Sequence, residues 1–134
     1  MGLDNGIIIK RNEYSNKIKA LKRFVDSYDK EEKYDFDVCY WRKCWNVRHD
    51  ILNILDSGED EEYYFILSIK NVKQIIKILK SYNEKTWEYG GWSGSIWLWS
   101  EHKKVNRKHI KNLKRLIRLM KKYPELEVYF YDSY

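Results

Sequence analysis

A long helix, a break and a strand follow one another in residues 103–131, KKVNRKHIKNLKRLIRLMKKYPELEVYFY. Between residues 103 and 122 the apolar side chains recur every three or four positions, which is the spacing of an amphipathic helix. They are Ile110, Leu113, Leu116, Ile117 and Met120. Pro124 interrupts this helix because proline lacks a backbone N–H. Residues 126–131 are then rich in β-branched and aromatic side chains, which predicts a final strand.

The same two patterns alternate along the rest of the chain. They predict strands at residues 6–10, 63–67 and 95–100, and either a strand or an extended lead-in at residues 34–38. They predict helices at residues 15–28 with Ser15 as N-cap, at residues 39–55, and after the N-cap Ser68. We therefore expect a single α+β domain over residues 1–134, in which a mixed, mostly antiparallel sheet of four to five strands packs with about four helices.

The predicted strands carry apolar side chains on both faces. In residues 95–100 the side chains of Trp97 and Trp99 would point one way and those of Ile96 and Leu98 the other. Either helices cover both faces of the sheet, or one face presents a wall of Trp and Tyr to a partner. We expect the covered sheet, because large exposed apolar patches are rare on soluble monomers.

Composition excludes several classes of protein. The chain has 134 residues, of which 43% are apolar and 34% charged, and a formal net charge of +6, which excludes a disordered tail and a collagen-like chain. No apolar run approaches the roughly 18 residues of a membrane helix, and the N-terminus lacks the layout of a signal peptide. Two cysteines in such a chain indicate reduced thiols, and hence a cytoplasmic protein.

The residue types that usually carry catalysis form no recognisable site. His102 and His109 are seven residues apart and share a face of the last helix, but no third metal ligand lies near them, so we expect solvated histidines. Cys39 and Cys44 lack redox spacing, and we expect buried structural thiols. The glycine-rich residues 89–95 precede a predicted strand rather than a helix, which favours a turn over a phosphate loop. We therefore expect no catalytic residues, no metal, no cofactor and no enzyme activity.

The cluster Tyr40-Trp41-Arg42-Lys43 is the strongest candidate for a binding site. At the predicted helix start it would place an indole beside a guanidinium, a combination suited to stacking on a base or anchoring a protein partner. In the alternative interpretation, Trp41 packs in the core on the same stripe as Trp45, while Arg42 and Lys43 are solvated charges. Trp97 and Trp99 are further candidates if their face of the sheet is open.

The last predicted helix is strongly basic. Its cations are opposed by one acid, Glu101, and they include Lys111, Lys114, Arg115 and Arg118, which we expect to be exposed. Such a face is able to follow a phosphate backbone, to meet an acidic protein surface, or to serve only as a solvated face. The predominance of lysine weakens the case for base-specific recognition, for which the arginine fork is preferred.

Two local patterns resemble a known family. They are Met1-Gly2-Leu3-Asp4 followed by a short apolar strand, and Val38-Cys39-Tyr40-Trp41-Arg42-Lys43. Together they resemble small proteins of unknown function from bacteriophages and prophages, which open with Met-Gly-Leu-Asp and carry a Tyr-Trp-Arg-Lys helix start. Members usually have a histidine eight residues after the tyrosine, where this chain has Arg48.

The resemblance implies a phage or prophage origin, and it says little about the mechanism. It leads us to expect a phage-encoded accessory protein in the host cytoplasm that binds a host protein or ribonucleoprotein complex and no membrane. The most concrete version is a stoichiometric inhibitor of a bacterial defence system, of the anti-CRISPR type. The alternative is a nucleic-acid-binding protein that uses the basic C-terminal helix.

Overall fold

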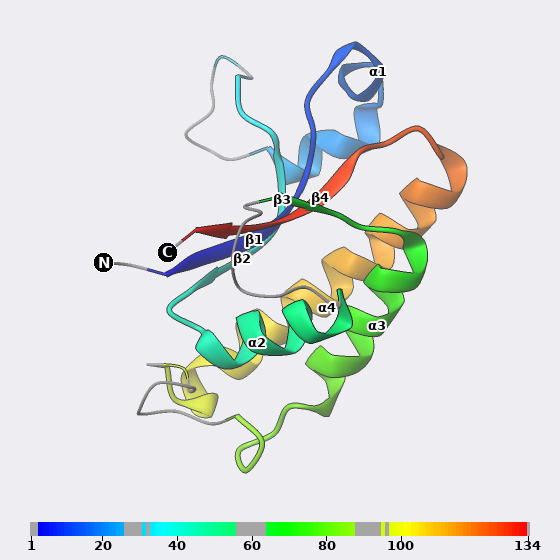
Figure 1. Ribbon diagram of the computed structural model, residues 1–134. Coiled ribbons are helices and arrows are strands. Elements are labelled where there is room, and N and C mark those ends of the chain that lie inside the picture. Colours follow the sequence, from blue (N-terminus) through cyan, green and yellow to red (C-terminus); the bar gives the residue numbers. More distant parts are fainter. Residues whose placement is uncertain are drawn as a thin grey trace.

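The fold is an antiparallel sheet with helices packed on one of its faces. The computed structural model describes residues 3–25, 31, 33–55, 64–87, 95 and 97–133. The strands are β1 (Asp4–Ile9), β2 (Phe36–Arg42), β3 (Tyr64–Ile66) and β4 (Val128–Ser133), in the sheet order β2-β1-β4-β3. The helices are α1 (Glu13–Asn16), the 3₁₀ helix η1 (Lys19–Phe24), α2 (Trp45–Ile54), α3 (Ile69–Ser81) and α4 (Trp99–Lys122). The predicted α+β class is confirmed, and all the described strand pairs are antiparallel (Figure 1).

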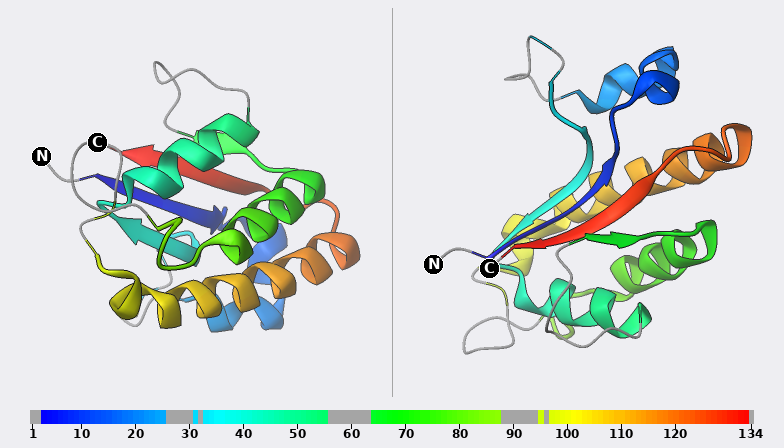
Figure 2. Two further views of the ribbon diagram at one scale, coloured as in Figure 1. Left: turned by 90° about the horizontal axis from the view of Figure 1, so that it is seen from below. Right: turned by 45° about the horizontal axis from the view of Figure 1, so that its top comes forward.

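The inner face of the sheet carries the core. Ile7 and Ile9 of β1 lie beside Phe130 and Val128 of β4, and all four side chains are buried. A bulge in β2 leaves Val38 unpaired between the partners of Ile7 and Ile8. The helices α2, α3 and α4 lie on this side of the sheet, as the view from below shows (Figure 2). Their buried side chains belong to the same core cluster.

The opposite face of the sheet is not covered by any of the described helices. Tyr64 and Ile66 of β3 are 61% and 74% exposed there, and Tyr40 of β2 is also exposed. The expectation that helices cover both faces is therefore wrong for the described part of the chain. The open face is made of tyrosine and isoleucine, however, and not of Trp97 and Trp99.

Those two tryptophans lie elsewhere because the described residues of this segment, 95 and 97–100, do not form the predicted strand. Ser95 makes an isolated bridge to Cys44, and α4 already begins at Trp99. The Glu101 carboxylate accepts a hydrogen bond of 3.0 Å from the backbone N–H of Leu98, which fixes the helix start. Glu101, the third residue of α4, thus caps the helix, and this cap favours a helix over the strand that the alternating pattern predicted.

The predicted first helix is shorter and differently capped. The Asn12 side chain accepts the backbone N–H of Ser15, so Asn12 is the N-cap and Ser15 closes the capping box. One helical turn follows, and the chain continues into η1 instead of a long α-helix. The predicted residues 26–28 and most of the glycine-rich stretch 89–95 lie outside the described residues.

The N-cap at Ser68 is confirmed, because its hydroxyl accepts the backbone N–H of Asn71 while the Asn71 side chain accepts the backbone N–H of Ser68. Among the described helices, none combines the length and the apolar character that a membrane crossing requires.

Candidate functional site

A pocket of about 400 Å³ lies where the end of β2 meets the start of α4. Two segments more than fifty residues apart in sequence form its walls. Its lining residues are Tyr40, Trp41, Arg42, Cys44, Trp97, Glu101, His102 and Val105. We call it the Trp97 pocket.

The cluster at residues 40–43 is not a helix start. Tyr40, Trp41 and Arg42 end the strand β2, and Lys43 has a φ of 53°, which turns the chain sharply before α2. Hydrogen bonding explains the turn, because the Lys43 backbone N–H donates to the Leu3 carbonyl at 2.7 Å and extends the pairing of β2 with β1. Strand alternation then puts Trp41 inside, at 1% exposure, and leaves Tyr40 and Arg42 exposed.

Trp97 forms the exposed wall of the pocket and is held at two points. Its indole N–H donates to the Arg42 carbonyl at 3.0 Å. Its own carbonyl accepts the indole N–H of the buried Trp87 at 2.7 Å. The ring nevertheless stays 41% exposed, so it is both fixed and accessible.

Tyr40 forms the opposite rim. Its hydroxyl donates to the Asp4 carboxylate at 2.6 Å. Partial burial and this acceptor raise the pKa of Tyr40 to about 12, so the phenol stays neutral at physiological pH.

Two buried histidines lie behind the pocket. The His102 ring stacks on Trp87 with ring centroids 4.2 Å apart, and His109 lies edge-on to Trp41 at 4.9 Å. Burial lowers the pKa of His102 to about 4 and that of His109 to about 3, so both are neutral at pH 7. The predicted solvated histidines are therefore wrong: the shared helix face points into the core.

The polar atoms of this cluster are not fully satisfied. Within the described residues, Nε2 of His102, Nδ1 of His109 and Nε1 of Trp41 are buried without a hydrogen-bond partner. The same residues contain no group of three or more His, Cys, Asp or Glu side chains arranged to hold a metal ion. The cluster is therefore a neutral wall for the pocket.

Cys39 and Cys44 are free and buried, which confirms the predicted buried thiols. Burial raises the pKa of Cys39 well above its usual value. It also raises the pKa of Cys44 to about 11, although hydrogen bonds to Ser95 and to the Arg42 backbone act in the opposite direction. Both thiols are protonated at pH 7 and are poor nucleophiles.

A second feature is the basic surface that α3 and α4 form together. Lys111, Lys114 and Arg118 of α4 are exposed as predicted, whereas Arg115 is half-buried against η1. α3 adds four exposed lysines at three- and four-residue spacing: Lys70, Lys73, Lys77 and Lys80. The two helices meet closely enough that the charge of Lys80 lowers the pKa of Lys114. The α3 row of lysines was not predicted, although its helical spacing is visible in the sequence.

The other predicted binding residues lie outside the Trp97 pocket. Lys43 is half-buried in the turn beside it. Trp99 is also half-buried, packs against Trp87 with ring centroids 5.7 Å apart, and lines a separate hollow of about 240 Å³. Sequence reasoning did not place Val105 and Glu101 in the pocket, because only the observed start of α4 brings them there.

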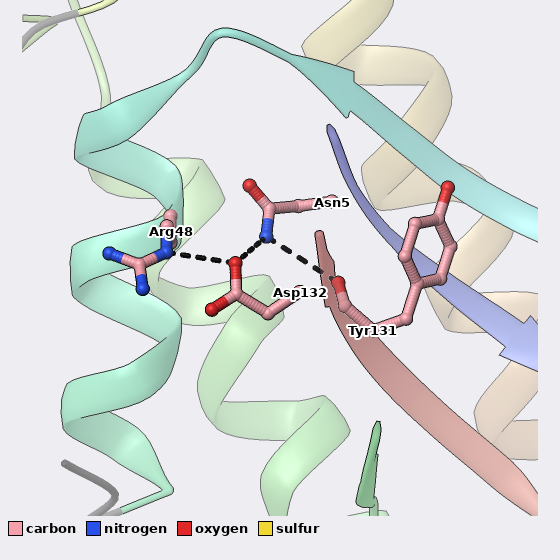
Figure 3. Close-up of polar contacts among 4 residues, drawn as sticks. All are labelled: Asn5, Arg48, Tyr131 and Asp132. Atoms are coloured by element: carbon pink, nitrogen blue, oxygen red, sulfur yellow. Dashed lines mark hydrogen bonds and ion pairs between the residues drawn. The ribbon is translucent and has the colours of Figure 1, made fainter. Parts of the chain in front are cut away.

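Arg48 lies in a buried ion pair. Its Nε donates to the Asp132 carboxylate of β4 at 2.8 Å, and Asn5 of β1 donates to the same oxygen at 2.6 Å (Figure 3). Both charged side chains are nearly inaccessible to solvent. A signal for this pair was present, because Arg48 falls on the inward stripe of Trp41, Trp45 and Leu52, and a charge on such a stripe needs a partner.

No family model matches the sequence, and no curated protein or solved structure is significantly similar to the chain. Three features of the described residues are candidate binding surfaces: the Trp97 pocket, the basic surface and the open face of the sheet.

Proposed function

We propose that this protein acts by binding a partner protein, and that the Trp97 pocket holds an apolar side chain of that partner. The observation that carries the proposal is the convergence of Tyr40, Trp41, Arg42 and Trp97 around one hollow of about 400 Å³. Tyrosine, tryptophan and arginine are the residue types that dominate binding energy in protein interfaces. A volume of this size accepts one or two large apolar side chains.

The pocket is suited to tight binding because its walls are already ordered. Trp97 is fixed by hydrogen bonds at its indole and at its carbonyl. An interface side chain that is fixed before binding loses little conformational entropy when the partner arrives. Arg42 and Glu101 add one charge of each sign at the rim, which favours one orientation of the partner.

The proposal is one of binding rather than turnover. The histidines behind the pocket are neutral, and the two thiols are protonated, so these groups supply neither a base of suitable pKa nor a nucleophile. The resemblance to phage proteins suggests the first partners to test: defence complexes in the cytoplasm of a bacterial host, including CRISPR effectors. Stoichiometric inhibition of such a complex is the form of activity we propose.

The test compares two exposed apolar side chains at the start of α4. Trp97→Ala removes the pocket wall, whereas Leu98→Ala alters a neighbour that is 45% exposed and does not line the pocket. Tagged wild-type protein and both variants are incubated with bacterial lysate, and the affinity of each recovered partner is measured with purified components. We expect a 1:1 complex for wild type and L98A, and at least a tenfold weaker complex for W97A. A partner bound equally by W97A, or no specific partner at moderate salt, would contradict the proposal.

A second candidate function is nucleic-acid binding through the α3–α4 basic surface. The observation in its favour is that α3 extends the cations of α4 sideways, with Lys80 close to Lys114. A surface of this kind neutralises phosphates and releases counterions, so its affinity falls steeply as salt rises. Binding that loses its salt dependence on charge reversal in α4, but survives W97A, would favour this candidate.

A further inference from the structure

A small hollow between η1 and α4 is lined by three arginines. Arg23 comes from η1, and Arg115 and Arg118 come from α4. Ala20 and Leu119 complete the lining, and the volume is about 140 Å³. We call it the arginine hollow. None of these five described residues carries a negative charge.

Helical spacing explains why these side chains meet. Ala20 and Arg23 are three residues apart in η1, and a 3₁₀ helix has three residues per turn, so the two side chains lie one above the other. Arg115, Arg118 and Leu119 are separated by three and four residues, so they share one face of α4. These two faces meet at the arginine hollow.

The three guanidinium groups lack a neutralising carboxylate. Within the part of the chain that the structure describes, no ion pair joins any of them to an acidic side chain. Arg23 also lines a neighbouring hollow of about 380 Å³, where Asp37 is balanced by a further cation, Lys108. Arginine stays charged at all physiological pH values, so the three cations repel one another until an anion lies between them.

The choice of arginine points to an oxyanion. The chain contains 19 lysines and seven arginines, yet all three cations of this hollow are arginines. A guanidinium fork makes two parallel hydrogen bonds to the oxygens of a phosphate or carboxylate, whereas an ammonium group acts as a point charge. The hollow is also smaller than the roughly 300 Å³ at which sites for whole small molecules begin, so it suits a single group.

We propose that the arginine hollow binds a terminal phosphate group, either inorganic phosphate or the phosphate of a phosphorylated side chain. On serine such a group carries a charge of about −1.5 to −2 at pH 7 and three acceptor oxygens, so it is able to meet forks from three arginines. A carboxylate offers one charge and two oxygens. The phosphate of a nucleic acid also has one charge, and two of its oxygens are bonded to sugars.

Ala20 keeps the hollow open. It is the single alanine of the chain, and its side chain ends at Cβ, so a longer side chain would occupy the space beside the arginines. Ala20→Leu therefore blocks the site without changing any charge. The position is exposed, so the variant should fold.

The experiment measures the Tm and the NMR amide shifts of the full chain while inorganic phosphate replaces chloride at constant ionic strength and neutral pH. We expect a saturable rise in Tm, because a ligand that binds only the folded state stabilises it. The amide shifts should be largest in residues 19–24 and 115–119. A phosphoserine peptide and its unphosphorylated form are the second arm. Tighter binding of the phosphorylated peptide than of inorganic phosphate assigns the group to a phosphorylated partner, and equal affinity assigns it to the free ion.

Three variants test whether geometry, and not charge alone, makes the site. Ala20→Leu should abolish phosphate binding. Arg115→Lys keeps the charge but removes the fork, and it should weaken binding by about fivefold or more. The matched control is Arg107→Lys, which changes an exposed arginine of α4 outside the hollow and should alter affinity by less than about twofold.

An equal rise in Tm with acetate, shifts that do not saturate, or unchanged affinity in the folded Ala20→Leu variant would overturn the proposal. Stronger competition by duplex DNA than by the phosphoserine peptide would also overturn it and would assign the arginines to a nucleic-acid surface. The hollow shares no residue with the Trp97 pocket. Trp97→Ala should therefore leave phosphate binding unchanged even if it abolishes partner binding, which separates this inference from the proposed function.

Discussion

The ring of Tyr131 lies directly over Gly6 in the neighbouring strand. A Cβ added to Gly6 would stand 2.7 Å from Cζ of that ring and 2.7 Å from the Cys39 carbonyl oxygen. The ring is able to move, but the carbonyl belongs to the backbone of β2. Gly6 therefore allows an aromatic side chain on one strand to cover the backbone of the next.

Gly6→Ala should consequently destabilise the protein by about 1–3 kcal/mol, the usual range for overpacking a tight site. Denaturant unfolding of the purified variant measures this loss. Tyr131→Ala in the same background should recover only part of it, because the clash with the Cys39 carbonyl remains. Full recovery would show that the ring alone excludes a side chain at position 6.

Removing one partner of the Arg48–Asp132 ion pair should be more costly. Asp132→Asn leaves a buried guanidinium without its carboxylate, and loss of a buried partner typically costs about 3–5 kcal/mol. The double variant Arg48→Met, Asp132→Leu should be less destabilised than Asp132→Asn, since no buried charge is left unpaired. Chemical denaturation of the wild type and the two variants decides this, and a double variant at least as destabilised as Asp132→Asn would contradict it.

Stability should depend on pH through the buried histidines. Their folded pKa values of about 4 and about 3 lie below the ordinary 6.5, so below pH 6.5 the unfolded chain binds protons that the folded chain does not. The free energy of unfolding should therefore fall as pH falls from 7 to 5, with a slope approaching about 1.4 kcal/mol per pH unit for each histidine. His109→Gln should reduce the slope. A wild-type protein equally stable at pH 7 and pH 5 would refute this.

The two thiols should be unreactive in the folded protein. Cys39 and Cys44 are buried and have raised pKa values, so an aromatic disulfide reagent at pH 7 should modify them only after unfolding. The expected result is slow labelling in buffer and two equivalents of thiol released in denaturant. Rapid labelling of either cysteine in the native state would show that it is accessible.

Charge reversal on α4 separates the two candidate functions. Lys111→Glu, Lys114→Glu and Arg118→Glu change exposed positions, so stability should shift by less than about 0.5 kcal/mol for each. If the partner is nucleic acid, affinity should fall for every nucleic-acid sequence. The slope of log affinity against log salt concentration should also become shallower by about 1 for each lost phosphate contact. If the partner is a protein held by Trp97, association should slow while dissociation changes little. A matched charge reversal at the exposed Lys10, Lys17 and Lys19 is the control. Identical association and dissociation rates in both variants would show that the charges of α4 are only solvated.

The long-range pattern of the sequence predicted more of the fold than of the site. Stripes such as Leu113 and Leu116 fix α4 because helical spacing is repeated over many residues. The segments around Trp41 and Trp97 were misassigned because each is short and dense in aromatic residues, so helix and strand spacing fit equally well. Their outcome depended on two hydrogen bonds, from Lys43 to Leu3 and from Leu98 to Glu101, which periodicity does not reveal.

In the candidate site, too, the residue types were predictable from the sequence but their arrangement was not. Tyr40, Arg42 and Trp97 were recognised as residue types suited to binding, but their meeting in one pocket follows from the turn at Lys43 and the early start of α4. The open face of the sheet was foreseen only as an alternative, in which one face presents a wall of Trp and Tyr. Its residues come from four separate strands, so the register of the whole sheet was needed to align them.

The lysines of α3 and α4 concentrate positive charge on one layer of the molecule. These two helices hold fourteen cations and one carboxylate, whereas the other described residues hold eleven cations and ten carboxylates and are nearly neutral. A negatively charged surface would therefore turn the α3–α4 layer toward itself before any specific contact forms. This orienting torque should vanish once the Debye length shrinks below the size of the domain.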